Sequence, residues 1–117
     1  MIDDRFLAEE LQRFSTEREW DPFHTPKNIA SALSVEASEL LEIFQWTRGQ
    51  HDWSEIDENA AVRDHVEEEV ADILLYLIRF ASLANIDLQQ AALKKISKNA
   101  VKYPVARSKG SDKKYNE

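Results

Sequence analysis

Apolar residues recur every three or four positions in four stretches of the chain, the spacing that one face of an α-helix requires. In the first stretch this face holds Leu7, Leu11 and Phe14. The helices expected from the pattern cover about residues 3–18, 26–47, 59–83 (or from 54) and 88–102. The chain is therefore predicted to be all-α, a four-helix bundle.

Residues with strong positional preferences support these helix boundaries. Thr25 is a good N-cap, and Pro26 suits the first position of a helix. Asp87, with Gln90 three residues later, forms a capping-box pattern at the start of the last helix. Pro104 disfavours helix in the residue before it, so this helix is expected to end near residue 102.

Four acidic residues lie on the expected apolar faces, in two pairs with the same spacing. Glu36 and Glu39 belong to the second expected helix, and Glu69 and Asp72 to the third. Residues three apart share one side of a helix, and buried carboxylates are costly unless something neutralises them. Two such pairs could enclose a divalent cation, and their oxygen atoms suit Mg²⁺ or Mn²⁺ better than zinc.

Two other interpretations of the acidic pairs remain open. Carboxylates at this spacing are common on the solvent faces of acid-rich helices, although both pairs here fall on apolar stripes. The pairs could also be neutralised by a buried salt-bridge network with Arg63, Arg79 or Lys95. Among the three consecutive glutamates at 67–69, the helical wheel selects Glu69 as the inward one.

Composition and charge narrow the function classes. The 117 residues include no cysteine, which excludes disulfides and thiolate metal sites, and no apolar run is long enough to span a membrane. Residues 94–117 carry eight basic and two acidic side chains, a net charge of +6. Because the whole chain has a net charge of −7, the other residues together carry −13. An acidic body disfavours long nucleic acid. We expect a cytoplasmic protein without membrane partners, with a domain at 1–104 and a basic, mobile tail at 105–117.

The spacing of the acidic pairs resembles a known enzyme family. The pattern Glu-x-x-Glu, a spacer and Glu-x-x-Asp is similar to that of the all-α nucleoside triphosphate pyrophosphohydrolases, the MazG-like superfamily. The flanking segments resemble the dCTP pyrophosphatase branch of this superfamily, and they lie at residues 17–28, 36–46, 68–77, 95–104 and 113–115. The resemblance extends over nearly the whole chain.

The resemblance implies Mg²⁺-dependent hydrolysis of a nucleoside triphosphate to the monophosphate and pyrophosphate. The implied substrate is dCTP or a related pyrimidine nucleotide, and the implied role is the removal of unwanted nucleotides from the cellular pool. The residues that match the family's metal-binding and catalytic positions are Glu36, Glu39, Glu69 and Asp72. The residues that match its nucleotide-binding positions are Trp20, His24, Trp46, Tyr76, Lys95 and Asn99. The family's typical assembly implies a homotetramer, a dimer of dimers with sites at subunit boundaries.

One position departs from the resemblance, and the sequence also bears on two other function classes. Leu11 stands where some relatives carry a histidine near the base, which weakens any expectation of strict cytosine selectivity. A di-metal carboxylate oxidase is disfavoured, because that class uses Glu-x-x-His motifs and this chain has none. The remaining alternative is a non-catalytic acidic helical module for interaction or oligomerisation, which predicts no turnover and no dependence on metal.

Overall fold

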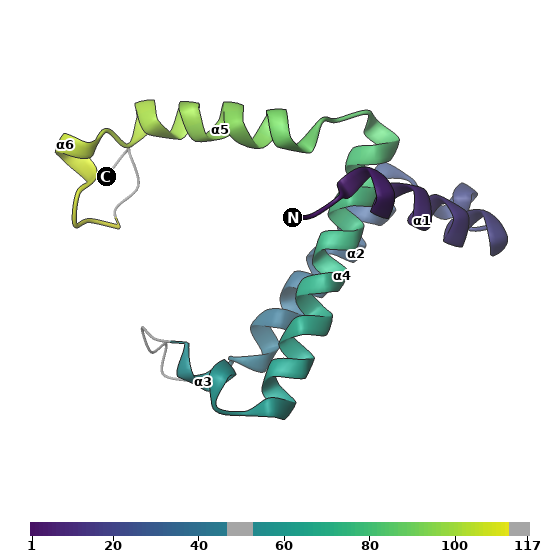
Figure 1. The fold of residues 1–117 in the computed structure, drawn as a ribbon, viewed down its shortest axis with the longest axis horizontal. Helices are drawn as coiled ribbons and strands as arrows, with labels where there is room; N and C mark the ends of the chain where they lie inside the picture. The colour runs from purple at the N-terminus through teal and green to yellow at the C-terminus, as the bar shows by residue number, and fades with distance from the viewer. Residues whose placement is uncertain (47–52, 113–117) are drawn as a thin grey trace. The chain divides into compact units, whose positions relative to one another are not determined.

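The structure, a computed structural model, describes residues 1–46 and 53–112, and within these ranges it contains helices and no strand (Figure 1). The α-helices are α1 (Asp4–Glu17), α2 (Pro26–Ile43), α3 (Ser54–Asp57), α4 (Ala60–Ala84), α5 (Leu88–Lys102) and α6 (Val105–Ser108), and a short 3-10 helix, η1 (Asp21–Phe23), lies between α1 and α2. The all-α prediction is therefore confirmed. None of the described helices is both long and apolar enough to cross a membrane.

Side-chain caps place the start of three helices where the sequence predicts them. Asp3, Thr25 and Asp87 precede α1, α2 and α5, and each accepts a hydrogen bond from the backbone N–H three residues later, at 3.0, 3.2 and 3.0 Å. Each of these bonds satisfies a backbone donor that has no partner within the helix. The end of α5 at Lys102, two residues before Pro104, is also as predicted.

The third expected helix, from about residue 59, is confirmed as α4, whereas the alternative start at residue 54 falls in a separate short helix. The short helix α3 ends at Asp57, and α4 begins at Ala60 after a break at Glu58 and Asn59. The Asn59 Oδ1 atom accepts hydrogen bonds from the backbone N–H groups of Ala61 and Val62, at 3.1 and 3.2 Å, so this residue caps α4. A local cap thus interrupts an otherwise continuous helical pattern.

Two other expected boundaries differ or cannot be compared. Helix α2 ends at Ile43 and a turn follows to Trp46, so the helix is shorter than expected; Thr47, where its end was expected, lies outside the described residues. The expected mobile tail contains the short helix α6, while its Lys113–Tyr115 motif also lies outside the described residues. The expected domain boundary at residue 104 stays a prediction.

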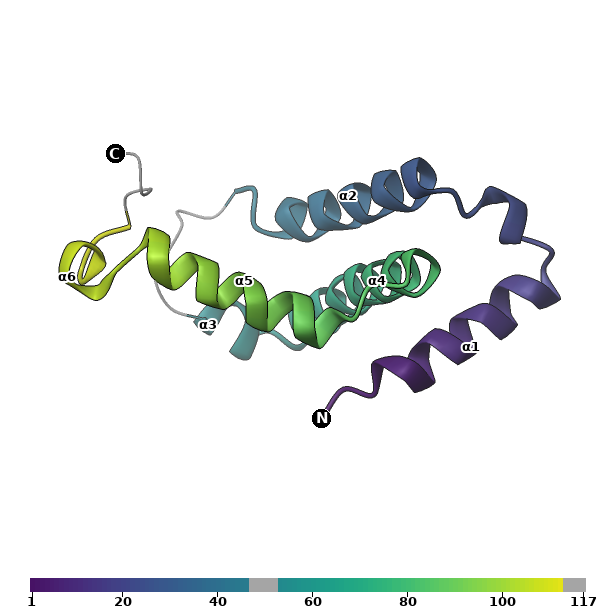
Figure 2. The same ribbon diagram turned by 90° about the horizontal axis from the view of Figure 1, so that it is seen from above.

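The chain forms two compact units, Met1–Ala84 and Asn85–Glu117. In the first unit α4 packs against α1, α2 and α3, and Figure 2 shows it running beside α2 and α1. The apolar residues most fully buried within the described chain are Ile29 of α2 and Ile78 and Ala81 of α4. This packing brings the acidic faces of α2 and α4 together.

Candidate metal and nucleotide site

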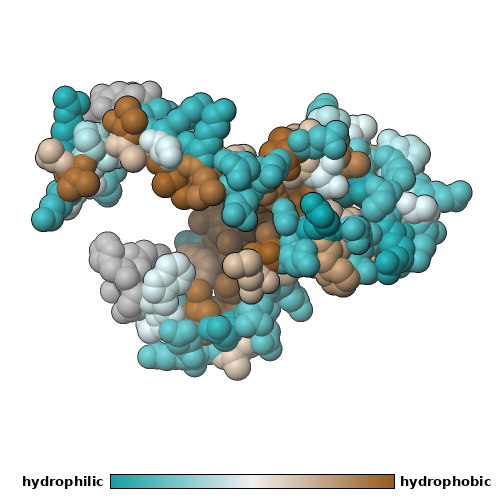
Figure 3. Space-filling model, turned by 45° about the horizontal axis from the view of Figure 1, so that its top comes forward, coloured by the Kyte–Doolittle hydropathy of each residue, from teal (hydrophilic) through white to brown (hydrophobic). Residues whose placement is uncertain are grey.

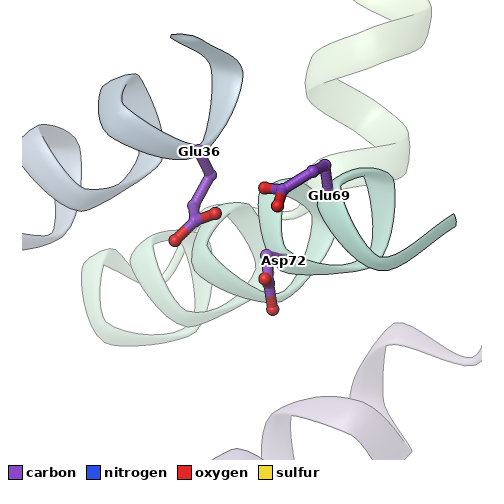
Figure 4. Close-up of side chains that lie close together, drawn as sticks. All are labelled: Glu36, Glu69 and Asp72. Atoms are coloured by element: carbon purple, nitrogen blue, oxygen red, sulfur yellow. The ribbon is translucent and has the colours of Figure 1, made fainter. Parts of the chain in front are cut away.

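Three of the four predicted carboxylates meet between α2 and α4. Glu36 extends from α2 toward Glu69 of α4, and Asp72 lies one helical turn further along α4 (Figure 4). Each of the three offers an oxygen atom within 4.8 Å of the others. The spacing of three residues puts Glu69 and Asp72 on one side of α4, and the packing of α2 against that side adds Glu36. The sequence prediction of a carboxylate cluster is confirmed for these three residues.

The cluster contains polar atoms that the protein itself does not satisfy. Glu69 is only 8% exposed, and the Oε2 atoms of Glu36 and Glu69 are buried without a hydrogen-bond partner in the described structure. Burying an unpaired carboxylate oxygen is costly, and a bound cation would remove that cost. A donor set made only of carboxylate oxygens fits Mg²⁺ or Mn²⁺. These residues therefore fit a hard divalent cation.

The neighbouring acids change the protonation of Glu36. Hydrogen bonding to the carboxylate of Glu69, followed by hydrogen bonding to that of Glu39, raises the pKa of Glu36 from 4.5 to about 7. Burial of the side chain and the charge of Asp72 act in the same direction. The metal-free cluster therefore holds a proton at mildly acidic pH, and a cation must compete with that proton.

This raised pKa predicts how the stability of the metal-free protein depends on pH. Because the folded-state pKa of about 7 exceeds the usual 4.5, the folded chain keeps a proton that the unfolded chain loses between these values. The contribution of Glu36 is present in full below pH 4.5 and is lost as the pH rises through about 7. Urea unfolding in the presence of a chelator should therefore give a lower free energy of unfolding at pH 8 than at pH 5.

A matched variant tests the origin of that pH dependence. Glu36→Gln removes the titrating group and keeps its shape, so its free energy of unfolding should vary less between pH 5 and pH 8 than that of the wild type. Saturating Mg²⁺ should restore stability to the wild type at pH 8, because a ligand of the folded state stabilises it. An unchanged pH dependence in the variant would contradict the assignment to Glu36.

The two arginines expected as possible partners of the clustered acids pair with other acidic residues. Arg63 pairs with Asp57 and Glu67, both at 3.3 Å, on the exposed side of α4. Arg79 pairs with Asp21, so neither arginine neutralises the cluster. The alternative of a salt-bridge network through these two arginines is wrong. Among the described residues, His65 comes near the cluster, with Nε2 3.5 Å from Oε1 of Glu69.

Glu39 occupies a different position from the other three acids. It lies on α2, one turn after Glu36, and is partly buried. Its carboxylate is close enough to contribute to the raised pKa of Glu36, but it is not part of the set whose oxygen atoms lie within 4.8 Å. Its role as a metal ligand stays a prediction.

A largely apolar cavity adjoins the carboxylates. It has a volume of about 480 Å³, and its lining includes Asp72, which also belongs to the cluster. Its other lining residues come from α1, α4 and the intervening loop: Leu7, Glu10, Leu11, Phe14, Trp20, His24, Leu75, Tyr76 and Arg79. An apolar cavity with a few polar groups is typical of small-molecule sites.

Three of the residues predicted to bind nucleotide line this cavity. Trp20, His24 and Tyr76 also line a smaller neighbouring cavity of about 370 Å³. Trp20 packs edge-to-face on Phe14, with ring centroids 5.6 Å apart. Burial, followed by the charges of Glu36, Asp72 and Glu39, raises the pKa of Tyr76, so its hydroxyl stays protonated and can donate a hydrogen bond.

The lining of this cavity does not include the other three residues predicted to bind nucleotide. Trp46 follows α2 in a turn, and its side chain is 89% exposed. Lys95 and Asn99 lie on α5 in the second compact unit, and both are exposed. The binding roles of these three residues stay predictions.

The sequence analysis missed a polar network that forms one wall of the cavity. Arg79 is 4% exposed and donates hydrogen bonds from Nε to His24 Nδ1 (2.9 Å), from Nη1 to Gln12 Oε1 (2.8 Å) and from Nη2 to Asp21 Oδ1 (3.2 Å). The helical spacing gives one signal for the position of Arg79: it lies seven residues after Asp72 and so falls on the same face of the helix. Its partners lie more than 50 positions away in the chain, and no local pattern identifies them.

The sequence of the chain is similar to those of known proteins. A dCTP pyrophosphatase 1 from Bos taurus is 41% identical over 108 residues, which are 89% of this chain and 61% of that protein. The corresponding Homo sapiens protein is 37% identical over the same shares. The chain thus spans less than two thirds of the length of these relatives.

A solved structure and a family match complete the comparison. The crystal structure of a pyrophosphatase from Archaeoglobus fulgidus is 42% identical, with a TM-score of 0.73, over 86% of this chain and 91% of that one. Residues 31–117 match the MazG-like family, and this segment contains all the carboxylates of the cluster. The chain therefore belongs to the MazG-like family.

Proposed function

We propose that this protein is a Mg²⁺-dependent nucleoside triphosphate pyrophosphohydrolase that converts a deoxynucleoside triphosphate to the monophosphate and pyrophosphate. The observation that carries the proposal is the shared wall between a carboxylate cluster and an apolar cavity, since Asp72 belongs to both. Such a site can hold a charged triphosphate at one end and a flat, aromatic base at the other. The names of the relatives favour dCTP or a related pyrimidine nucleotide as substrate. Clearance of unwanted nucleotides in the cytoplasm would be the corresponding role.

The metal would be held by Glu36, Glu69 and Asp72, with Glu39 as a further candidate. When bound, Mg²⁺ supplies charge neutralisation for the phosphate oxygens and lowers the pKa of nearby water. The buried, unpartnered oxygens of Glu36 and Glu69 support this assignment. The negative cluster would otherwise repel a polyphosphate, so the metal is required for the substrate to approach.

The protein's own residues would position the two ends of the nucleotide. Tyr76 lies one turn after Asp72, and its protonated hydroxyl can donate a hydrogen bond near the junction between phosphate and sugar. Trp20 offers an aromatic face in the cavity wall, on which a base can stack. The apolar side chains of Leu7, Leu11 and Leu75 would exclude water around the base.

A product assay across the common nucleotides tests the proposed function. With Mg²⁺, each turnover should yield one monophosphate and one pyrophosphate and no free phosphate, and a chelator should stop the reaction. Pyrimidine deoxynucleotides should be the preferred substrates. If no triphosphate is hydrolysed and Mg²⁺ with nucleotide does not raise the melting temperature, the non-catalytic helical module becomes the better account.

Trp20 offers a test of base stacking with a matched control. Trp20→Ala should raise KM for dCTP about tenfold, because loss of one base–aromatic stack costs roughly 1–3 kcal/mol. Trp53→Ala removes the same side chain from a position that is 74% exposed and outside the cavity lining, so KM should change little. Steady-state kinetics on both variants measures the difference, and equal KM values for them would contradict the stacking role.

The surface of the chain supports self-association, and we propose the homotetramer that the resemblance implies. Hydrophobic residues reach the surface on the face drawn in Figure 3, and exposed apolar side chains include Val35 and Leu41 on α2 and Val70 and Leu77 on α4. Such exposure is more typical of an interface than of a monomer surface. Light scattering should show four chains per particle, and a monomer at micromolar concentration would contradict this proposal.

A further inference from the structure

Arg79 holds the His24 ring in one protonation form. The guanidinium group carries only donors, so the Nδ1 atom of His24 must accept the 2.9 Å hydrogen bond from Arg79 Nε. Ser15 Oγ lies 3.4 Å from the same Nδ1, but its hydroxyl hydrogen is given to Asp21 in a short hydrogen bond. Nδ1 is therefore unprotonated, and a neutral His24 must carry its proton on Nε2.

The surroundings of His24 keep the ring neutral. Burial, followed by the positive charge of Arg79, lowers the pKa of His24, while Asp21 opposes this effect only in part. Arg79 is itself fixed by Gln12 and Asp21, so the ring cannot exchange this partner for another without breaking a buried network. The described part of the chain offers no acceptor for Nε2.

We propose that His24 is a specificity-determining residue that donates a hydrogen bond from Nε2–H to a carbonyl oxygen of the nucleobase, and that Arg79 is the residue that positions it. The ring lines the cavity proposed for the base and also the smaller neighbouring cavity, in both cases together with Trp20 and Tyr76. Cytosine, thymine and uracil all carry a carbonyl group that can accept this bond. The inference rests on the proposed function and adds a donor to a cavity whose other walls are mainly apolar.

Two substitutions separate the donor from the rest of the ring. His24→Asn places an amide oxygen near the position of Nδ1, so it can still accept from Arg79, but it removes the donor. His24→Gln places an amide N–H₂ near the position of Nε2 and so restores the donor. Relative to the wild type, KM for dCTP should rise about tenfold in His24→Asn and only about twofold in His24→Gln, as loss of one neutral hydrogen bond predicts.

Inorganic tripolyphosphate with Mg²⁺ is the control ligand, because it has the phosphates of the substrate and no base. Its inhibition constant against dCTP hydrolysis should be the same in the wild type and in His24→Asn, within about twofold, well below the effect of a lost hydrogen bond. An equal loss of affinity for both ligands would overturn the proposal, since it would place His24 at the phosphates or show a general loss of structure. An unchanged KM for dCTP in His24→Asn would also overturn it.

The tautomer can be measured without turnover. In ¹⁵N NMR spectra of the full chain at neutral pH, the His24 signals, identified by their loss in His24→Asn, should show an unprotonated Nδ1 and a protonated Nε2. A protonated Nδ1 would refute the inference even if the enzyme hydrolyses dCTP. Conversely, the expected tautomer in a protein that hydrolyses no triphosphate would refute the proposed function and leave the role of Arg79 standing.

Discussion

Replacing Glu69 by glutamine is expected to lower kcat/KM for triphosphate hydrolysis about a thousandfold, or ~4 kcal/mol in the activation free energy. Glu69 is 8% exposed, and its oxygen atoms form part of the carboxylate cluster. Glutamine has the same shape but lacks the negative charge that would hold a divalent cation. Asp72→Asn should act in the same way, because Asp72 belongs to the same cluster.

The helical fold should survive this change. The Oε2 atom of Glu69 has no hydrogen-bond partner in the described structure, so glutamine loses little there and also removes one negative charge from the cluster. Far-ultraviolet circular dichroism and the melting temperature without metal should therefore match or exceed those of the wild type. The stabilisation by Mg²⁺ that is expected for the wild type should be absent.

The neighbouring residue supplies the control. Glu68→Gln removes the same charge one position earlier on α4, where the side chain is exposed and lies outside the cluster. Its kcat/KM should stay within about twofold of the wild type, as is usual for exposed substitutions. Equal activity in the two variants would mean that the cluster is not the reactive centre.

Much of the fold could be predicted because its determinants are local. Asp3, Thr25 and Asp87 each cap a helix through a bond to a backbone N–H three residues away, so the sequence alone identifies these helix starts. The break before α4 follows the same rule, since Asn59 is a cap, but the apolar spacing continues on both sides of it. This local signal agrees with the expected start near residue 59, while the periodicity alone would also allow the start at residue 54.

The site was predictable to the extent that one helical face determines it. Glu36, Glu69 and Asp72 lie on apolar stripes, and the packing of two such stripes brings them together. Whether Glu39 joins them depends on the rotation of α2 about its axis, which periodicity does not determine. The pairing of Arg79 with Asp21 depends on how α1 and η1 close over α4, and only the folded chain shows it.

Replacing Arg79 by leucine is expected to destabilise the folded chain by about 3 kcal/mol, because a buried cation and its hydrogen bonds are lost together. Arg79 is 4% exposed and joins α4 to α1 through Gln12 and to η1 through Asp21. The remaining partners would be left without their donor in the cavity wall. Thermal unfolding should show a melting temperature lower by about 10 °C.

Arg63→Leu is the matched control, since it removes the same side chain from the same helix. Arg63 is 53% exposed and forms ion pairs with Asp57 and Glu67 at the surface. Exposed pairs of this kind contribute less than about 1 kcal/mol, so its melting temperature should fall by only a few degrees. Similar losses in the two variants would show that the Arg79 network contributes no more than surface ion pairs. A large loss in Arg79→Leu alone would show that this network holds α1 and the His24 loop against the helix that carries Glu69 and Asp72.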